Sequence, residues 1–234
     1  MITNDFLQIA ALIAALIILT PLLGRFCYNI LTGQGAKYLR PFQLLENLTY
    51  KVSGIDAKAE MSWKQYASAL LLFNLCGFVI VFLLQMLQHL LPLNPQNLPA
   101  TSWHLAFNTA ISFTTNTNWQ AYAGETTLSY LTQMIGLTVQ NFVSAATGIA
   151  VLAALARGIS RKTSGTLGNF WTDMTRSTVH ILLPLAIVWT LVLVGQGVIQ
   201  NVDSYQMATT IEGKEQILPM GPAASQIAIK QLGT

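Results

Sequence analysis

Residues 114–120 form an uncharged run of hydroxyl and amide side chains in a 234-residue chain, between a short apolar segment and a very long one. Threonine and asparagine hydrogen-bond the nearby main chain, which can hold backbone carbonyls toward one axis. Carbonyl oxygens arranged in this way can replace the hydration shell of a cation such as K⁺ without any fixed charge. The run is therefore a candidate cation-selective segment, and a loop that is polar because it is wet is the alternative interpretation.

Composition and hydropathy predict the elements that position this run. Hydrophobic residues make up 53% of the chain and charged residues 9%, with a mean hydropathy of +0.50. Soluble domains carry about 25% charged residues, so these values predict a membrane protein. A helix needs about 20 apolar residues to cross the hydrocarbon core. Several runs of this length in one chain predict an all-α, polytopic membrane protein. Long runs without Asp, Glu, Lys or Arg cover residues 6–24, 66–91, 128–156 and 179–199.

The loop charges predict the orientation of these spans. Basic residues gather in two connections, residues 25–65 and residues 157–178, and residues 92–127 contain none. By the positive-inside rule both connections are cytoplasmic, so the N-terminus and residues 114–120 are expected outside. The basic residues are Arg25, Lys37, Arg40, Lys51, Lys58 and Lys64 in the first connection, and Arg157, Arg161, Lys162 and Arg176 in the second.

The outer segment contains a short helix that is expected to enter the membrane. Thr101 or Ser102 can cap a helix over residues 103–113, whose body is apolar. Eleven residues reach about 16 Å, or half a bilayer, so the chain must return through residues 114–120. Non-helical backbone at membrane depth is tolerated only where protein buries it or water lines it. Residues 66–156 are therefore predicted to form a membrane-pore-membrane module.

The same arrangement begins a second time near the end of the sequence. A span at 179–199 is followed by a short, mostly apolar helix over 222–232 and then Gly233-Thr234. A Leu-Pro pair precedes each short helix, at residues 98–99 and 218–219. Residues 179–234 are therefore predicted to be an incomplete second module. In the third span, the small-xxx-small spacing of Ser144 and Gly148 indicates close helix packing rather than chemistry.

Catalytic chemistry is not expected in this chain. The spans contain no carboxylates and no paired histidines, which an intramembrane enzyme would need. There is no GxxxxGK[ST] loop, and the largest cytoplasmic connection is too small for a nucleotide-binding domain. We therefore expect no catalytic residue, no transition-metal site, no organic cofactor and no nucleic-acid partner. If ATP drives transport here, another polypeptide must supply it.

Six stretches run along nearly the whole chain, and several are long enough to be specific to one family. They are Met61-Ser62-Trp63-Lys64-Gln65-Tyr66, Leu91-Pro92-Leu93-Asn94-Pro95-Gln96, Asn108-Thr109-Ala110 through Thr115-Asn116-Thr117-Asn118-Trp119-Gln120, Gly124-Glu125-Thr126-Thr127-Leu128-Ser129-Tyr130, Gly136-Leu137-Thr138-Val139-Gln140-Asn141-Phe142 and Leu218-Pro219-Met220-Gly221-Pro222. These stretches closely resemble the potassium-binding (KdpA) subunit family of the Kdp potassium-transporting ATPases.

The resemblance implies the K⁺-transporter superfamily fold, with four membrane-pore-membrane modules around one selectivity filter after an extra N-terminal span. It also implies K⁺ as the transported ion, a P-type ATPase subunit and small accessory subunits as partners, and a bacterial inner membrane as the location. The filter residues it implies are Thr115, Asn116, Thr117 and Asn118, with Gln120 at the rim and Thr234 opening the second segment. The Asn-Gly-Gly-Gly run that follows this Thr in the family, and the third and fourth modules, are absent from the sequence.

The leading hypothesis is thus a K⁺-binding, filter-bearing N-terminal part of an ATP-driven uptake subunit. One alternative is an ATP-independent, channel-like K⁺ uptake subunit of the same superfamily. Another is a non-conducting remnant, because a pore needs all four walls. A truncated product, a partial gene model and one piece of a split subunit are all compatible with the sequence.

Overall fold

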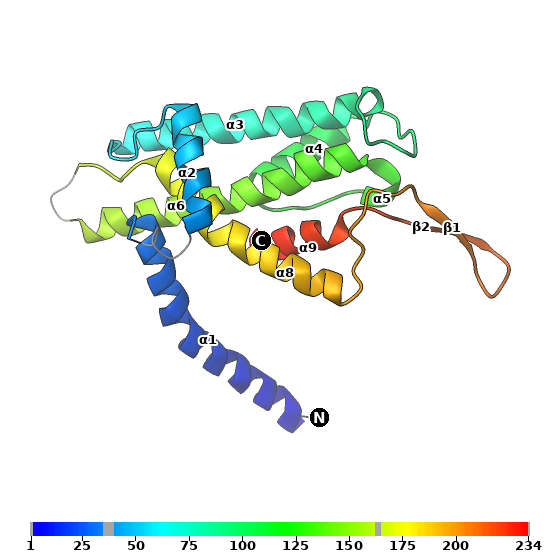
Figure 1. The fold of residues 1–234 in the computed structure, drawn as a ribbon, viewed down its shortest axis with the longest axis horizontal. Coiled ribbons are helices and arrows are strands. Elements are labelled where there is room, and N and C mark those ends of the chain that lie inside the picture. The colour runs from blue at the N-terminus through cyan, green and yellow to red at the C-terminus, as the bar shows by residue number, and fades with distance from the viewer. Residues whose placement is uncertain (1, 35–39, 162–164, 234) are drawn as a thin grey trace.

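The computed structural model describes residues 2–34, 40–161 and 165–233 as a helical bundle with one small β-hairpin (Figure 1). Segments η3 and η4 are π-helical and η2 is a 3₁₀ turn. The helices are α1 (Ile2–Leu31), α2 (Arg40–Ser53), α3 (Trp63–Leu87), η2 (Gln88–Leu90), α4 (Trp103–Thr114), α5 (Gly124–Thr127), η3 (Thr132–Thr138), α6 (Val139–Ser160), α7 (Phe170–Arg176), η4 (Ser177–Leu182), α8 (Leu183–Gly195) and α9 (Ala223–Gly233).

The hairpin projects from one end of the bundle (Figure 1). Its strands, β1 (Gln206–Thr209) and β2 (Glu215–Leu218), pair antiparallel with Gln206 opposite Leu218. Gly213 supplies the positive φ, 78°, that its turn requires. The hydropathy pattern gave no indication of this hairpin, because the two strands are short and almost fully exposed.

Within the described residues, four helical stretches are long and apolar enough to cross a membrane, which confirms the predicted all-α polytopic fold class. They are Asp5–Leu31, Trp63–Leu90, Thr132–Ser160 and Phe170–Gly195. The second stretch has a clear start signal in the sequence. At the N-terminus of α3, Ser62 and Gln65 form a reciprocal capping box.

The third and fourth long helices extend past the bounds that hydropathy suggests. The third continues beyond residue 156 to Ser160, and the fourth begins at Phe170 rather than Val179. The added turns contain Arg157 and Asp173, whose side chains pair at 2.5 and 2.7 Å. Because the two charges compensate each other, Arg157 and Asp173 are tolerated inside these helices. A search for segments without charged residues excludes both positions.

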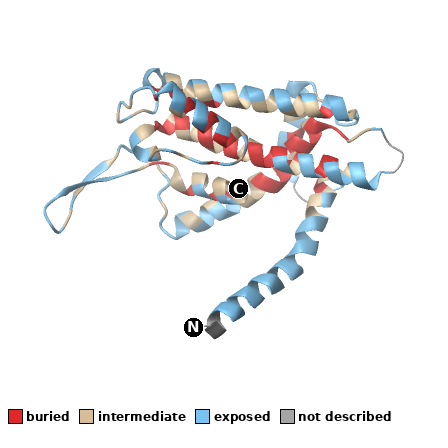
Figure 2. Cartoon of the chain, turned by 180° about the vertical axis from the view of Figure 1, so that it is seen from behind, coloured by how far each residue is buried: buried red, intermediate tan, exposed pale blue. Residues whose placement is uncertain are grey.

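Helix α6 is the centre of the bundle. Helix α4 packs on α3 and α6, and α9 packs on α8 and α6, so each short helix lies against the long helix before it (Figure 1). Alanines dominate the buried positions of α6, including Ala146 and Ala150, both fully buried. Small side chains let neighbouring backbones approach closely, which explains why the buried residues of Figure 2 concentrate there.

Helix α1 stands away from the bundle and touches it only near its C-terminal end, where Ile30 is buried (Figures 1 and 2). Its most apolar stretch has no buried residue. Arg176 of α7 holds this end by donating from Nη1 to the carbonyl of Leu31 at 3.2 Å.

The amphipathic helix α2 docks on α7 and η4 through one buried carboxylate. Glu46 is 5% exposed and accepts from Arg176 Nε at 3.0 Å and Tyr50 Oη at 2.8 Å, and His180 Nε2 lies 2.7 Å away. Burial by itself would raise the pKa of Glu46, but the hydrogen bonds from Arg176, Tyr50 and His180 outweigh it and lower the pKa. The ionised carboxylate thus fixes α2 to the bundle.

Candidate functional site

The candidate site begins where α4 ends. Ser102 caps the helix by accepting from the Leu105 N–H at 3.4 Å, as its position before an apolar run predicts. Twelve residues later the helix stops at Thr114. Helix α4 is about 18 Å long at 1.5 Å per residue, and its negative dipole end points toward the polar run.

Residues 115–118 turn back sharply on the helix end. Asn116 and Asn118 adopt positive φ angles of 60° and 54°, a left-handed conformation that asparagine tolerates better than most residues. The N–H groups of Thr117 and Asn118 both donate to the carbonyl of Ser112, at 2.9 and 3.1 Å. The alternation of asparagine and threonine therefore matches the backbone conformations that this return requires.

The carbonyl oxygens of this return are free within the described part of the chain. The N–H groups of residues 115–118 all point back to α4, whereas no described residue donates to the carbonyls of these four positions. Unpaired carbonyl oxygens beside a helix C-terminus form a favourable environment for a cation without any carboxylate. This is the chemistry that the sequence suggests for the run.

The threonine hydroxyls are directed to the protein. Thr115 Oγ1 donates to the carbonyl of Ile111 at 2.9 Å and lies 3.0 Å from Thr117 Oγ1. These contacts tie the return to the last turn of α4. A role for Thr115 in ion binding would therefore fall to its carbonyl rather than its hydroxyl.

Asn116 joins three elements that are distant in the sequence. Its Nδ2 donates to the carbonyl of Gly233 at 2.7 Å, and its Oδ1 accepts from Ser144 Oγ at 3.0 Å. The first polar return thus touches both the end of α9 and the middle of α6. The small-residue spacing of α6 predicts only a packing role for Ser144. Its bond to Asn116 could not be predicted, because the two residues are far apart in the sequence.

Asn118 and Gln120 lie in different surroundings. Asn118 is 8% exposed, and neither side-chain amide atom has a hydrogen-bond partner among residues 2–34, 40–161 and 165–233. Gln120 is half-buried and donates from Nε2 to Tyr122 Oη at 3.1 Å. Together with Pro222 and Gln226, Gln120 lines a cavity of about 310 Å³. Thr234, the remaining predicted site residue, lies outside the described residues.

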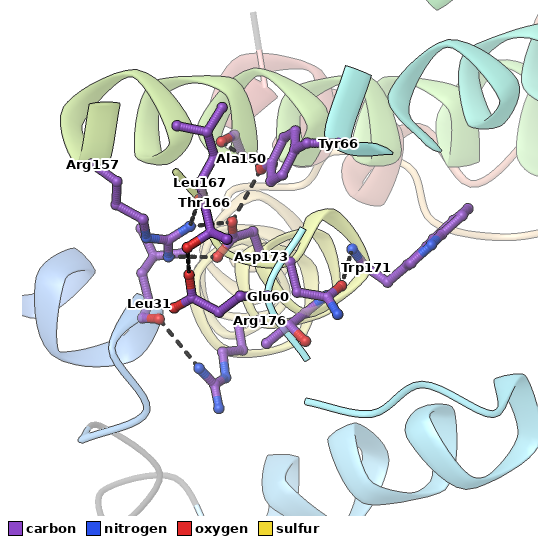
Figure 3. Close-up of polar contacts among 12 residues, drawn as sticks. Leu31, Glu60, Tyr66, Ala150, Arg157, Thr166, Leu167, Trp171, Asp173 and Arg176 are labelled. Carbon is purple, nitrogen blue, oxygen red and sulfur yellow. Dashed lines mark hydrogen bonds and ion pairs between the residues drawn. The ribbon is translucent and has the colours of Figure 1, made fainter. Parts of the chain in front are cut away.

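A charged cluster lies where the C-terminal end of α6 meets α7 and the segment before α3 (Figure 3). Arg157 makes a bidentate pair with Asp173, which also accepts from Tyr66 Oη at 3.0 Å. Nearby, Glu60 pairs with Arg161 at 2.8 Å and accepts from Thr166. The hydrogen bonds from Thr166 and Arg161 lower the pKa of Glu60. In the sequence, Arg157 and Arg161 indicate only a cytoplasmic connection, and no local pattern predicts their pairing with Asp173 and Glu60.

The fold and the site define a class: a polytopic membrane protein in which a short helix ends at a polar return whose carbonyls accept no hydrogen bond from the described residues. Residues 10–234 match the family described as the potassium-transporting ATPase A subunit (KdpA), and the chain belongs to that family.

The chain is similar to several proteins named potassium-transporting ATPase potassium-binding subunit. It is 60% identical to that of Pseudomonas syringae pv. tomato over 230 residues, which is 98% of this chain. It is 56% identical to that of Pseudomonas aeruginosa over 232 residues and 55% identical to that of Rhodospirillum centenum over 234. In each case the chain spans 41% of the relative's length.

Proposed function

We propose that this chain supplies one wall of a K⁺ selectivity filter in an ATP-driven K⁺ uptake complex. The supporting observation is the run of free carbonyls at residues 115–118, at the negative end of α4. In this proposal the carbonyls of Thr115, Asn116, Thr117 and Asn118 bind K⁺, Gln120 lies at the outer rim and Thr234 begins a second wall. The contact of Asn116 with Gly233 supports the idea of two adjacent walls.

The names of the relatives and the chemistry of the chain support the partners that we propose. The relatives are subunits of a potassium-transporting ATPase. In our proposal a separate P-type ATPase subunit hydrolyses ATP, and small accessory subunits complete the complex. Membrane-pore-membrane modules, one complete at residues 66–156 and one begun at 179–234, would be joined by further walls outside this sequence.

The proposed orientation has the N-terminus and the filter outside a bacterial inner membrane. Arg157 and Arg161 lie at the end of α6 that is distant from the filter, and Arg176 lies near the end of α1. A cluster of basic residues on one side favours the cytoplasm for that side. Lys37 and Lys162, which contribute to this pattern in the sequence, lie outside the described residues.

Transport assays with a matched pair of asparagine variants test the filter. A complete subunit carrying this sequence would be co-expressed with its ATPase partner in a strain that lacks other K⁺ uptake. Asn118→Ala removes the residue that favours φ of 54° at the filter, whereas Asn97→Ala makes the same change at φ of 52° in the exposed outer loop. We expect Asn118→Ala to raise the KM for K⁺ and the Rb⁺/K⁺ uptake ratio by about tenfold, or 1.4 kcal/mol.

Asn97→Ala should leave both quantities at the wild-type level. Equal behaviour of the two variants, with equal amounts of protein in the membrane, would contradict the filter assignment. Selective uptake that persists without the ATPase partner would instead support the channel-like alternative. Labelling of a cysteine introduced at position 97 tests the orientation. We expect it to react only with a reagent added from outside.

A further inference from the structure

Ser144 is a buried hydroxyl in the middle of α6 that faces the candidate filter. It is 4% exposed, donates to Asn116 Oδ1 at 3.0 Å, and lies 3.2 Å from the carbonyl of Asn141 in its own helix. A serine inside a helix ordinarily satisfies its hydroxyl on a nearby carbonyl of the same helix. The single Ser144 hydroxyl proton is instead shared with Asn116, and this bond links α6 to residues 115–120, which are not helical.

The partners of Asn116 fix the direction of its amide. The carbonyl of Gly233 can only accept, so the Asn116 Nδ2 must face it, and the Oδ1 is then left facing the Ser144 hydroxyl. Both ends of the side chain are thereby occupied. Because Asn116 also holds a left-handed φ of 60°, its position sets the direction of the adjoining carbonyls.

The end of α9 is held against the same part of α6. A Cβ atom built on Gly233 would lie 3.0 Å from the Ala145 Cβ and 3.2 Å from the Asn141 carbonyl oxygen. Only glycine allows this approach without a shift of backbone. Helix α6 therefore supports the first polar return through Ser144 and the start of the second through direct contact with Gly233.

We propose that Ser144 is a positioning residue for ion selectivity, which holds Asn116 so that the two filter walls keep a fixed register. This inference rests on the proposed function of residues 115–118. Selectivity in a carbonyl filter depends on how many carbonyls surround the ion and where they lie. Loss of the Ser144 bond leaves the Asn116 amide free to rotate away from Gly233, which loosens one wall relative to the other.

The test compares Ser144→Ala with Thr147→Ala in the complete subunit and its ATPase complex. Thr147 is one turn along α6, is 8% exposed and donates to the Val143 carbonyl of its own helix, so it is a matched buried hydroxyl without a bond to the filter. We expect Ser144→Ala to raise the Rb⁺/K⁺ uptake ratio and the KM for K⁺ about three- to tenfold with little change in maximal rate. Thr147→Ala should leave the ratio unchanged.

Two further variants separate positioning from packing. Ser144→Cys keeps the side-chain volume but offers a weaker donor, so its selectivity should lie between serine and alanine. On an Asn116→Ala background, Ser144→Ala should cause no further change, because its effect passes through the Asn116 amide.

Unchanged selectivity of Ser144→Ala in a complex whose wild type takes up K⁺ selectively would overturn the inference and leave the proposed function standing. Failure of the wild-type complex to take up K⁺ selectively would overturn the proposed function itself. If Ser144→Ala does not reach the membrane in wild-type amounts, Ser144→Cys decides: selectivity equal to wild type overturns the positioning role, and reduced selectivity supports it.

Discussion

Replacing the buried Arg157–Asp173 pair tests how this fold tolerates charge inside its long helices. The Asp173 side chain is 2% exposed and the Arg157 side chain 19% exposed, and two short hydrogen bonds join them (Figure 3). Tyr66 Oη adds a third bond to Asp173, and Arg157 also donates to the Leu167 carbonyl at 3.1 Å. The pair therefore joins α3, α6 and α7 with the chain before α7.

The expected magnitude differs sharply between single and double replacements. Removing one partner of a buried pair costs about 3–5 kcal/mol, because the other charge is left uncompensated. Asp173→Leu should be at the lower end, about 3 kcal/mol, since Arg157 can reach water, and Arg157→Met should be at the upper end. The double replacement loses the Leu167 bond, worth about 1 kcal/mol, while the single Tyr66 hydroxyl proton can be donated wholly to the Ala150 carbonyl, 2.8 Å away.

Equilibrium unfolding in mixed micelles measures these differences. The four proteins of the cycle, wild type, the two single variants and the double variant, would be compared at one detergent composition. We expect both single variants to be clearly destabilised and the double variant to unfold within about 1–2 kcal/mol of the wild type. With losses of about 3 and about 5 kcal/mol in the single variants, the coupling free energy should then be about 6 kcal/mol.

Additive losses in the double variant would refute this reasoning. Such a result would mean that the two charges are solvated independently and that their pairing contributes nothing to the stability of the bundle. It would also remove the explanation for why the third and fourth long helices extend through these two residues.

Three further predictions follow from contacts elsewhere in the structure. Gly168→Ala should destabilise the protein, since a Cβ at φ of 98° would lie 2.4 Å from Arg157 Nη1, whereas Gly148→Ala, with open space around it, should be neutral or stabilising by up to about 1 kcal/mol in thermal unfolding. Gly233→Ala should lower the K⁺ uptake rate at equal membrane abundance, because its Cβ would press on α6. The pKa of Glu46 is lowered from its ordinary 4.5, so its contribution to α2 docking is complete above pH 4.5 and is lost only as the pH falls through the lower folded-state value. Glu46→Gln should therefore increase the hydrogen exchange of α2, corrected for intrinsic rates, at both about pH 7 and about pH 5.

Hydropathy and charge were enough to predict the helical membrane fold, because spans of about 20 apolar residues have few alternatives in a bilayer. The short helix over residues 103–113 could also be predicted, because Ser102 provides its cap and the residues from Thr115 onward favour a turn. The continuation of the helices through Arg157 and Asp173 could not be predicted from the sequence, because the mutual compensation of the two charges depends on two helices meeting. The role of Thr115, Asn116, Thr117 and Asn118 as a filter stays a prediction.

The amino-acid sequence by itself determined the class of protein, the number of long apolar helices and the uncharged polar run after the short helix. These features depend on local composition and on periodicity, which can be read directly from the sequence. Only the tertiary structure decided that Asn116 bonds to both Ser144 and Gly233, and that Glu46 is buried against Arg176 and His180. Such contacts join residues far apart in the chain, and their geometry exists only after the helices have packed.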